Sequence, residues 1–116
     1  MKQELLRLVR LPEERGLCAE LLCEIDHHTA RQLREEVDEA VLAARPALLV
    51  LDFSAVGFMD SSGLGLILGR LALCERIGAA LEVRGASEGV ARLLRLSGAA
   101  GKISLGEEQE KRRQTI

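Results

Sequence analysis

The chain has 116 residues, the length of one domain, and it is 47% hydrophobic and 29% charged, as folded globular proteins are. Its formal net charge is −2 and only 2% of its residues are aromatic, so it lacks the basic face and stacking rings of nucleic-acid binders. The longest apolar run, residues 64–74, contains Arg70 and is too short to cross a bilayer. Charges at Lys2, Glu4 and Arg7 argue against an N-terminal secretory signal. We therefore predict a cytoplasmic protein that binds neither nucleic acid nor membrane.

Three cysteines, Cys18, Cys23 and Cys74, form neither a CxxC pair nor a metal-ligand spacing with histidine. We expect them to be reduced thiols that fill small apolar spaces in the core. Asp26-His27-His28 has no second acidic cluster to complete a metal site, and we predict no metal and no cofactor.

The first two predicted elements are strands over residues 2–10 and 17–25, separated by a turn at residues 12–16. A loop of this length favours a β-hairpin, although an amphipathic helix is the competing interpretation of either segment.

A helix is predicted to follow Asp26. Thr29 and Gln32 fit a capping box, with Asp26 as the alternative cap, and Arg45-Pro46 ends the helix. Apolar residues recur at helical spacing, namely Ala30, Leu33, Val37, Ala40, Val41 and Ala44. The charged residues should form a solvated outer face, namely Arg31, Arg34, Glu35, Asp38 and Glu39.

Residues 48–69 organise the chain. A short apolar run at 48–53 predicts a buried strand, and Met59-Asp60-Ser61-Ser62-Gly63 precedes a helix that ends at Gly78. Short side-chain oxygens cap free helix N–H groups, so the default role of Ser61 and Ser62 is capping. One cap needs only one hydroxyl, so the second serine is available for another role. Because the positive end of a helix dipole stabilises an anion, a phosphate on one of these serines is one such role.

The predicted helix after Ser62 is apolar on more than one side. Its inward face should carry Leu64, Ile67, Leu68 and Leu71. The opposite face aligns Ser62, Leu66, Gly69 and Leu73, with Arg70 beside them. Because an outward face should be polar, we interpret this stripe as a partner-binding surface. Gly65 and Gly69 weaken the helix, which indicates either close packing or the close approach of another protein.

The rest of the chain predicts a strand at 80–84, a helix from Ser87 to Gly98, and a strand at 102–105. One face of that last helix should carry Val90, Leu93, Leu94 and Ser97. Residues 107–116 are charged and predict a helix or a tail. The order β-β-α-β-α-β-α-β implies a single α/β domain with a mixed, mostly parallel sheet and helices packed on it.

Enzymatic interpretations fit these motifs less well. A hydrolase nucleophile in G-x-S-x-G needs glycine two positions before Ser61, where Met59 stands. Gly63, Gly65 and Gly69 are spaced one residue too long for a dinucleotide fingerprint.

Two longer motifs are more specific. Residues 24–30, EIDHHTA, and residues 58–65, FMDSSGLG, together resemble the anti-anti-sigma factors of the STAS domain family, in particular the antagonists of anti-sigma-F in spore-forming bacteria. Residues 67–70, 90–94 and 97–98 extend the resemblance over nearly the whole chain, with residues 1–106 as the domain. One departure is Cys23, where the family usually has glycine.

The resemblance implies a non-enzymatic regulator of transcription. The unmodified form would bind an anti-sigma factor that is also an ATP-dependent serine kinase, and so release a sigma factor during sporulation. Phosphorylation of Ser61, the serine directly after Asp60, would block the complex, and a PP2C-type phosphatase would restore it. Asp26 would border the same surface. A STAS module of a general stress-response pathway or of a signalling scaffold is the alternative.

Overall fold

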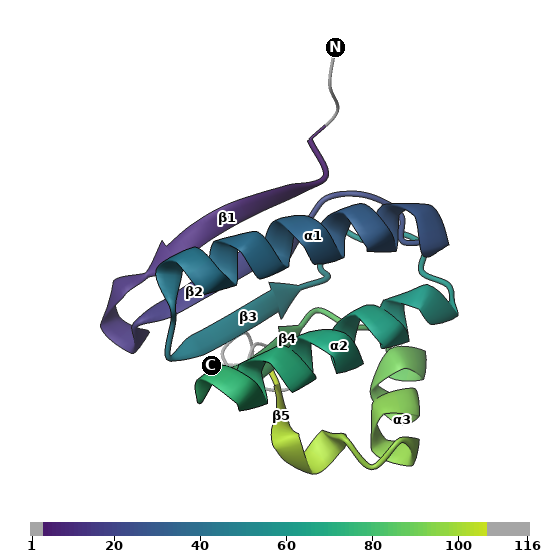
Figure 1. Ribbon diagram of the computed structural model, residues 1–116. Helices are drawn as coiled ribbons and strands as arrows, with labels where there is room; N and C mark the ends of the chain where they lie inside the picture. Colours follow the sequence, from purple (N-terminus) through teal and green to yellow (C-terminus); the bar gives the residue numbers. More distant parts are fainter. Residues whose placement is uncertain (1–3, 107–116) are drawn as a thin grey trace, which may run out of the picture.

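The computed structural model describes residues 4–106 of the chain and has the predicted order of elements (Figure 1). The strands are β1 (Leu6–Leu11), β2 (Gly16–Leu21), β3 (Leu48–Asp52), β4 (Ala80–Arg84) and β5 (Ile103–Leu105). The α-helices are α1 (His27–Ala44), α2 (Ser61–Ile77) and α3 (Glu88–Leu96), and two short 3-10 turns, η1 (Pro12–Glu14) and η2 (Ala100–Lys102), complete the described chain. The prediction for residues 107–116 lies outside the described residues.

The five strands form one sheet in the order β1-β2-β3-β4-β5. β1 and β2 pair antiparallel as the predicted hairpin, and the other pairs are parallel. Each parallel connection moves the chain one strand in the same direction, so right-handed crossovers put α1 and α2 on the same face of the sheet (Figure 1). The prediction of a mixed α/β domain is confirmed.

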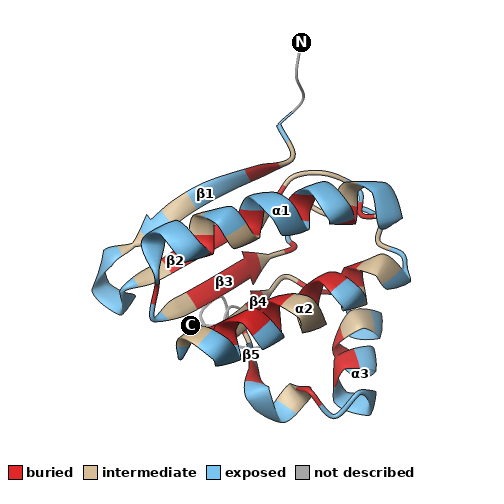
Figure 2. Cartoon of the chain, in the orientation of Figure 1, coloured by how far each residue is buried: buried red, intermediate tan, exposed pale blue. Residues whose placement is uncertain are grey.

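The core lies between this face and the helices, and Figure 2 shows β3 buried over most of its length. Strand residues in this core alternate along each strand, as in Leu49 and Leu51 of β3, and Leu81 and Val83 of β4. The opposite face carries a row of charges in register across four strands, made of Arg7, Glu20, Asp52 and Arg84. Arg7 pairs with Glu20 at 2.6 Å. A second row on this face, made of Val9, Cys18 and Val50, is apolar, so the charges cover only part of it.

The apolar stripe on α2 does not face solvent, so its prediction as an exposed partner-binding surface is wrong. Leu66 is 4% exposed and Leu73 is 6% exposed, because α1 packs alongside α2 on the same face of the sheet. A helix between a sheet and a neighbouring helix must bury two faces, and the outward-looking leucines fill that second interface.

Arg70 belongs to the same interface, and its prediction as a surface contact is also wrong. Arg70 is 5% exposed, and its Nε lies 2.8 Å from Oδ1 of Asp38 on α1. Burial lowers the pKa of the Arg70 guanidinium, and the Asp38 carboxylate opposes that shift. Asp38, predicted to be part of a solvated face, is therefore the counter-ion of a buried cation.

Some element bounds differ from prediction. β1 begins at Leu6, whereas the predicted strand covers residues 2–10, and β2 ends at Leu21 instead of residue 25. Of the two caps that the sequence left open for α1, Asp26 is the N-cap and Thr29 completes its capping box. On α3 the buried residues are Ala91 and Leu94, whereas Leu93, predicted to share a face with Leu94, is 45% exposed. No helix within residues 4–106 combines the length and apolarity needed to cross a membrane.

Candidate functional site

The segments before α1 and α2 are joined by backbone hydrogen bonds. Ile25 N donates to Phe58 O at 2.9 Å, and Asp60 N donates to Ile25 O at 3.0 Å. Ile25 and Met59 thereby form a parallel bridge beyond the ends of β2 and β3. Because the next residue on each strand extension is a helix cap, Asp26 and Asp60 are brought to the same edge of the molecule.

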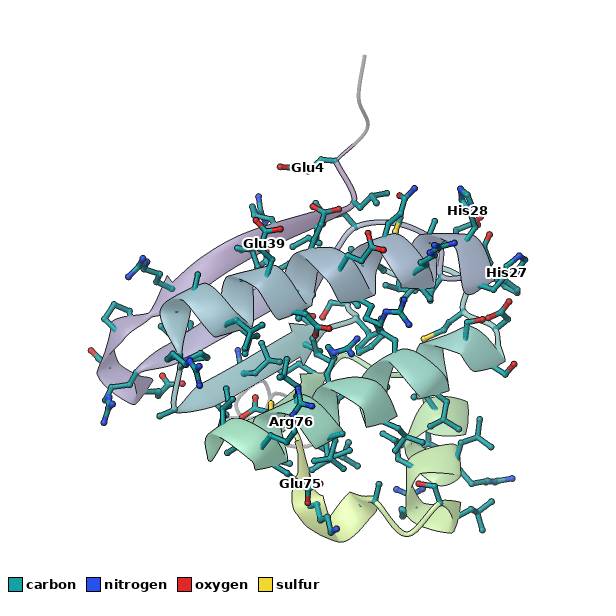
Figure 3. The ribbon with its side chains drawn as sticks, viewed as in Figure 1. Glu4, His27, His28, Glu39, Glu75 and Arg76 are labelled. Carbon is teal, nitrogen blue, oxygen red and sulfur yellow. The ribbon has the colours of Figure 1, made fainter. Side chains whose placement is uncertain are left out.

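Asp26 caps α1 with a reciprocal capping box. Its Oδ1 accepts from His28 N and Thr29 N, both at 2.9 Å, and Asp26 N donates to Thr29 Oγ1 at 3.0 Å. The hydrogen bond from Thr29 N, with that from His28 N, lowers the pKa of the Asp26 carboxyl. Figure 3 shows His27 and His28 projecting from this end of α1.

Asp60 caps α2 and leaves the following serine available. Its Oδ1 accepts from Ser62 N at 2.7 Å. Ser61 is the first residue of α2 and is exposed, while Ser62 is half-buried. The Ser61 hydroxyl therefore stands at the positive end of the α2 dipole with the carboxylate of the preceding residue nearby.

The two neighbouring serines border different depressions. Ser61 lines a cavity of about 310 Å³ between α2 and α3, whose apolar residues are Met59, Leu64, Val90 and Leu93. We call this depression the apolar groove. Asp60, Ser87 and Gly89 complete its lining. Phe58, which is 55% exposed, lines an adjoining cavity that shares Met59, Ser87 and Val90 with the groove, so exposed apolar surface continues beyond it.

Ser62 instead lines a cavity of about 420 Å³ between the first turns of α1 and α2. His27, Arg31 and Arg34 line this basic groove, with Ala30, Gly65 and Leu66 completing it. The first turn of α2 therefore presents the Ser61 hydroxyl to the apolar groove, which also holds Asp60, and the Ser62 hydroxyl to the basic groove.

The α2 glycines have different roles. A Cβ at Gly63 would overlap the side chain of Met59, so this position requires glycine while Met59 lies where it does. A Cβ at Gly65 or Gly69 would meet nothing within 4 Å among the described residues. Close packing within the described part of the chain therefore does not explain those two residues.

One group of potential metal ligands occurs within residues 4–106, where side-chain ligand atoms of Cys18, Glu20 and Asp52 lie within 4.8 Å of one another. Glu20 pairs with Arg7, and Asp52 Oδ1 accepts from Ser54 Oγ at 2.6 Å. Burial, with the Asp52 and Glu20 charges, raises the pKa of the Cys18 thiol to about 11, so the sulfur is protonated near neutral pH. These three groups suit a structural network better than a metal.

The comparison with protein families matches residues 13–111 to the STAS domain. The chain belongs to the STAS family. An anti-sigma F factor antagonist from Paenibacillus polymyxa is 40% identical over 91 residues, which are 78% of this chain and 78% of that protein. An anti-sigma-B factor antagonist from Bacillus subtilis (strain 168) is 32% identical over 87 residues, covering 75% of this chain and 78% of that protein.

A solved structure gives the same fold. The anti-sigma factor antagonist SpoIIAA in its unphosphorylated form superposes on this STAS domain with a TM-score of 0.70 at 26% identity, over 96% of this chain and 97% of that one. The resemblance read from residues 24–30 and 58–65 is therefore confirmed at the level of the family.

The predicted site residues separate into two sets in this STAS domain. Asp26, Asp60, Ser61, Ser62 and Gly63 lie together at the first turns of α1 and α2. Leu66, Gly69, Arg70 and Leu73 lie farther along α2, and all but the half-buried Gly69 are buried.

Sequence reasoning missed the α3 side of the apolar groove. The sequence placed Val90 and Leu93 on one face of the last helix, together with Leu94, and did not connect that face with Ser61. In the structure Leu94 is buried, whereas Val90 and Leu93 line the groove.

Proposed function

We propose that this chain is an anti-anti-sigma factor: unmodified, it binds an anti-sigma factor that is also a serine kinase, and so frees a sigma factor. Phosphorylation of Ser61 ends that binding, and a PP2C-type phosphatase restores it. The chain acts in the cytoplasm as a binding protein without enzymatic activity of its own. The relatives named as antagonists of anti-sigma F and anti-sigma-B support this function.

One observation carries the proposal. Ser61 is an exposed hydroxyl at a helix N-terminus, on the edge of an apolar groove that a protein partner could cover. A kinase needs an accessible hydroxyl, and a docking partner needs apolar surface, and both occur at the same place.

Phosphorylation would act here through local charge. The modification adds about −1.5 to −2 charges beside Asp60 and the apolar lining of the groove. A phosphate in that position must lose water when a partner docks, which opposes binding without any refolding of the chain.

A second setting is favoured by one of the relatives. The anti-sigma-B factor antagonist is 32% identical, so control of a general stress-response sigma factor, or a place in a signalling scaffold, is the alternative to sporulation sigma-F. Both settings use the same Ser61 switch, and they differ in the partner that is captured.

The test begins with capture of partners from the native host by the tagged chain, followed by their identification by mass spectrometry. The captured kinase and ATP should then add about 80 Da to the chain, the mass of one phosphoryl group. Ser61→Ala should abolish this mass shift, and Ser62→Ala, the matched control, should retain it. A full mass shift on Ser61→Ala would refute the proposed site, and capture of no sigma regulator would refute the proposed function.

A further inference from the structure

A large cavity lies at the other end of the molecule from Ser61. It measures about 520 Å³ and lies between the β1–β2 turn and the last turn of α1. Figure 1 shows this turn beside the C-terminal end of α1, at the end of the domain away from the first turn of α2. A volume of this size is within the range of small-molecule sites, roughly 300–1,000 Å³.

The lining of this cavity has an unusual composition. Its cations are Arg10, Arg15 and Arg45. Every other lining residue is aliphatic, proline or glycine, namely Leu8, Leu11, Pro12, Gly16, Leu17, Ala40, Ala43, Ala44 and Pro46. Among the described residues, no carboxylate, hydroxyl or amide side chain lines it, so the side chains that a ligand meets are aliphatic groups and guanidinium groups.

Within the described chain these arginines lack acidic partners. None of the three forms an ion pair with any residue within 4–106, whereas Arg7, Arg31 and Arg70 each do. The three arginines are exposed, as are Glu13 and Glu14 of the adjoining η1 turn, but these two acidic residues do not line the cavity. Three such cations around an apolar floor favour an anion from outside the chain.

Two of these arginines are helix C-caps. Arg15 ends η1 and Arg45 ends α1, and their positive φ angles, 52° and 47°, are those of left-handed caps whose backbone N–H groups bond to Pro12 O and Val41 O. Glycine adopts this left-handed conformation freely, while other residues are strained in it. Both capping positions line the same cavity, so the two helix ends bring their arginines to one place.

We propose that this cavity binds a small organic anion with an aliphatic body, such as a medium-chain carboxylate. The aliphatic body lies on the floor formed by Leu17, Ala40 and Pro46, and the anionic head is held by the arginines. Among the described residues no aromatic side chain lines the cavity to stack on a nucleobase, and its aliphatic floor favours an acyl body over a nucleotide.

Calorimetric titration of the full chain tests this proposal with three probes. Decanoate should bind, whereas acetate, which lacks the body, and decyltrimethylammonium, which has the opposite charge, should not. A parallel titration with phosphatidylglycerol vesicles shows whether the chain binds a free anion or an anionic headgroup on a lipid surface. Binding in either arm supports the proposal if the arginine variants weaken it.

The variants use the strained positions. Arg15→Gly and Arg45→Gly should each weaken binding about fivefold, as expected for loss of one partly exposed charge contact. Their Tm should be unchanged or higher, because glycine relieves the positive φ. Ala44→Leu should also weaken binding by filling the cavity, and Arg92→Ala, a loss of equal charge on α3, should leave it unchanged. Equal binding of decanoate and decyltrimethylammonium, an unaffected Arg15→Gly/Arg45→Gly double variant, or no binding in either arm would overturn the proposal.

Discussion

Ser61 and Ser62 offer a direct test of how charge controls partner binding, because they are adjacent in sequence and differ in surroundings. Ser61 lines the apolar groove beside Asp60, and Ser62 lines the basic groove with Arg31 and Arg34. We expect Ser61→Asp to weaken binding of the partner strongly and Ser62→Asp to weaken it little. Both variants should fold, since an aspartate in the first helical turn interacts favourably with the dipole.

The size of the effect follows from desolvation on docking. Two like charges roughly 4 Å apart repel by about 1 kcal/mol in water and by about 4 kcal/mol at an effective dielectric of 20. In the Ser61→Asp variant, covering the apolar groove moves the new carboxylate and that of Asp60 from the first regime toward the second, a cost of about 3 kcal/mol before the dipole returns up to about 1 kcal/mol. The remaining 2 kcal/mol or so corresponds to an affinity loss of about thirtyfold.

Affinities are measured by titration of wild-type, Ser61→Ala, Ser61→Asp and Ser62→Asp chains against the purified partner. Ser61→Ala should bind as tightly as the unmodified wild type, because it adds neither charge nor bulk. Equal affinities of Ser61→Asp and Ser61→Ala would show that charge at this position does not govern docking. An equal loss in Ser61→Asp and Ser62→Asp would show that the two grooves are not electrostatically distinct to the partner.

Three further predictions concern stability. Asp38→Ala should lower the free energy of unfolding by about 2–3 kcal/mol in urea denaturation, which is less than for a fully buried pair because Asp38 is 33% exposed. Adding Arg70→Met should recover most of this loss, because it removes the cation that lost its partner. If the double variant recovers no stability, an uncompensated cation is not the cause. The pKa of Asp26 is lower in the folded chain than its ordinary value, so the ionised carboxylate stabilises the fold at pH values above that ordinary pKa. The Tm of wild type should therefore exceed that of Asp26→Asn at pH 7, and the difference should shrink as the pH falls below about 4. A difference in Tm that stays constant with pH would contradict this. Gly65→Ala should stabilise α2 by about 1 kcal/mol in urea, since its Cβ meets nothing among the described residues, and a destabilised variant would show that the helix is constrained there.

Local chemistry was readable from the sequence because its causes lie within a few residues. Asp60 before Ser61 and Ser62 marks a helix start whatever packs around it, and the strand before it is closed by turn residues. The competing caps Thr29 and Asp26 are two halves of one capping box, which spacing alone leaves ambiguous.

Burial on the sides of α2 was not readable in the same way. Helical periodicity identifies an apolar arc, but it does not say whether a sheet, another helix or solvent lies against it. In the sequence, Leu66 and Leu73 look like an exposed stripe, because nothing in their own segment shows that α1 packs against them. Pairing of Asp38 with Arg70 has the same origin, since the two residues belong to different helices.

The apolar groove supplies a last prediction, because α3 carries two exposed leucines of which one lines it. Leu93 is 45% exposed and lines the groove, and Leu96 is 77% exposed and does not. Docking that covers the exposed part of Leu93 contributes about 1–2 kcal/mol, so Leu93→Ser should weaken partner binding about fivefold to thirtyfold. Leu96→Ser removes more exposed apolar surface and should leave the affinity unchanged. If Leu96→Ser weakens binding as much as Leu93→Ser in the same titration, the partner covers the outer side of α3 instead of the groove beside Ser61.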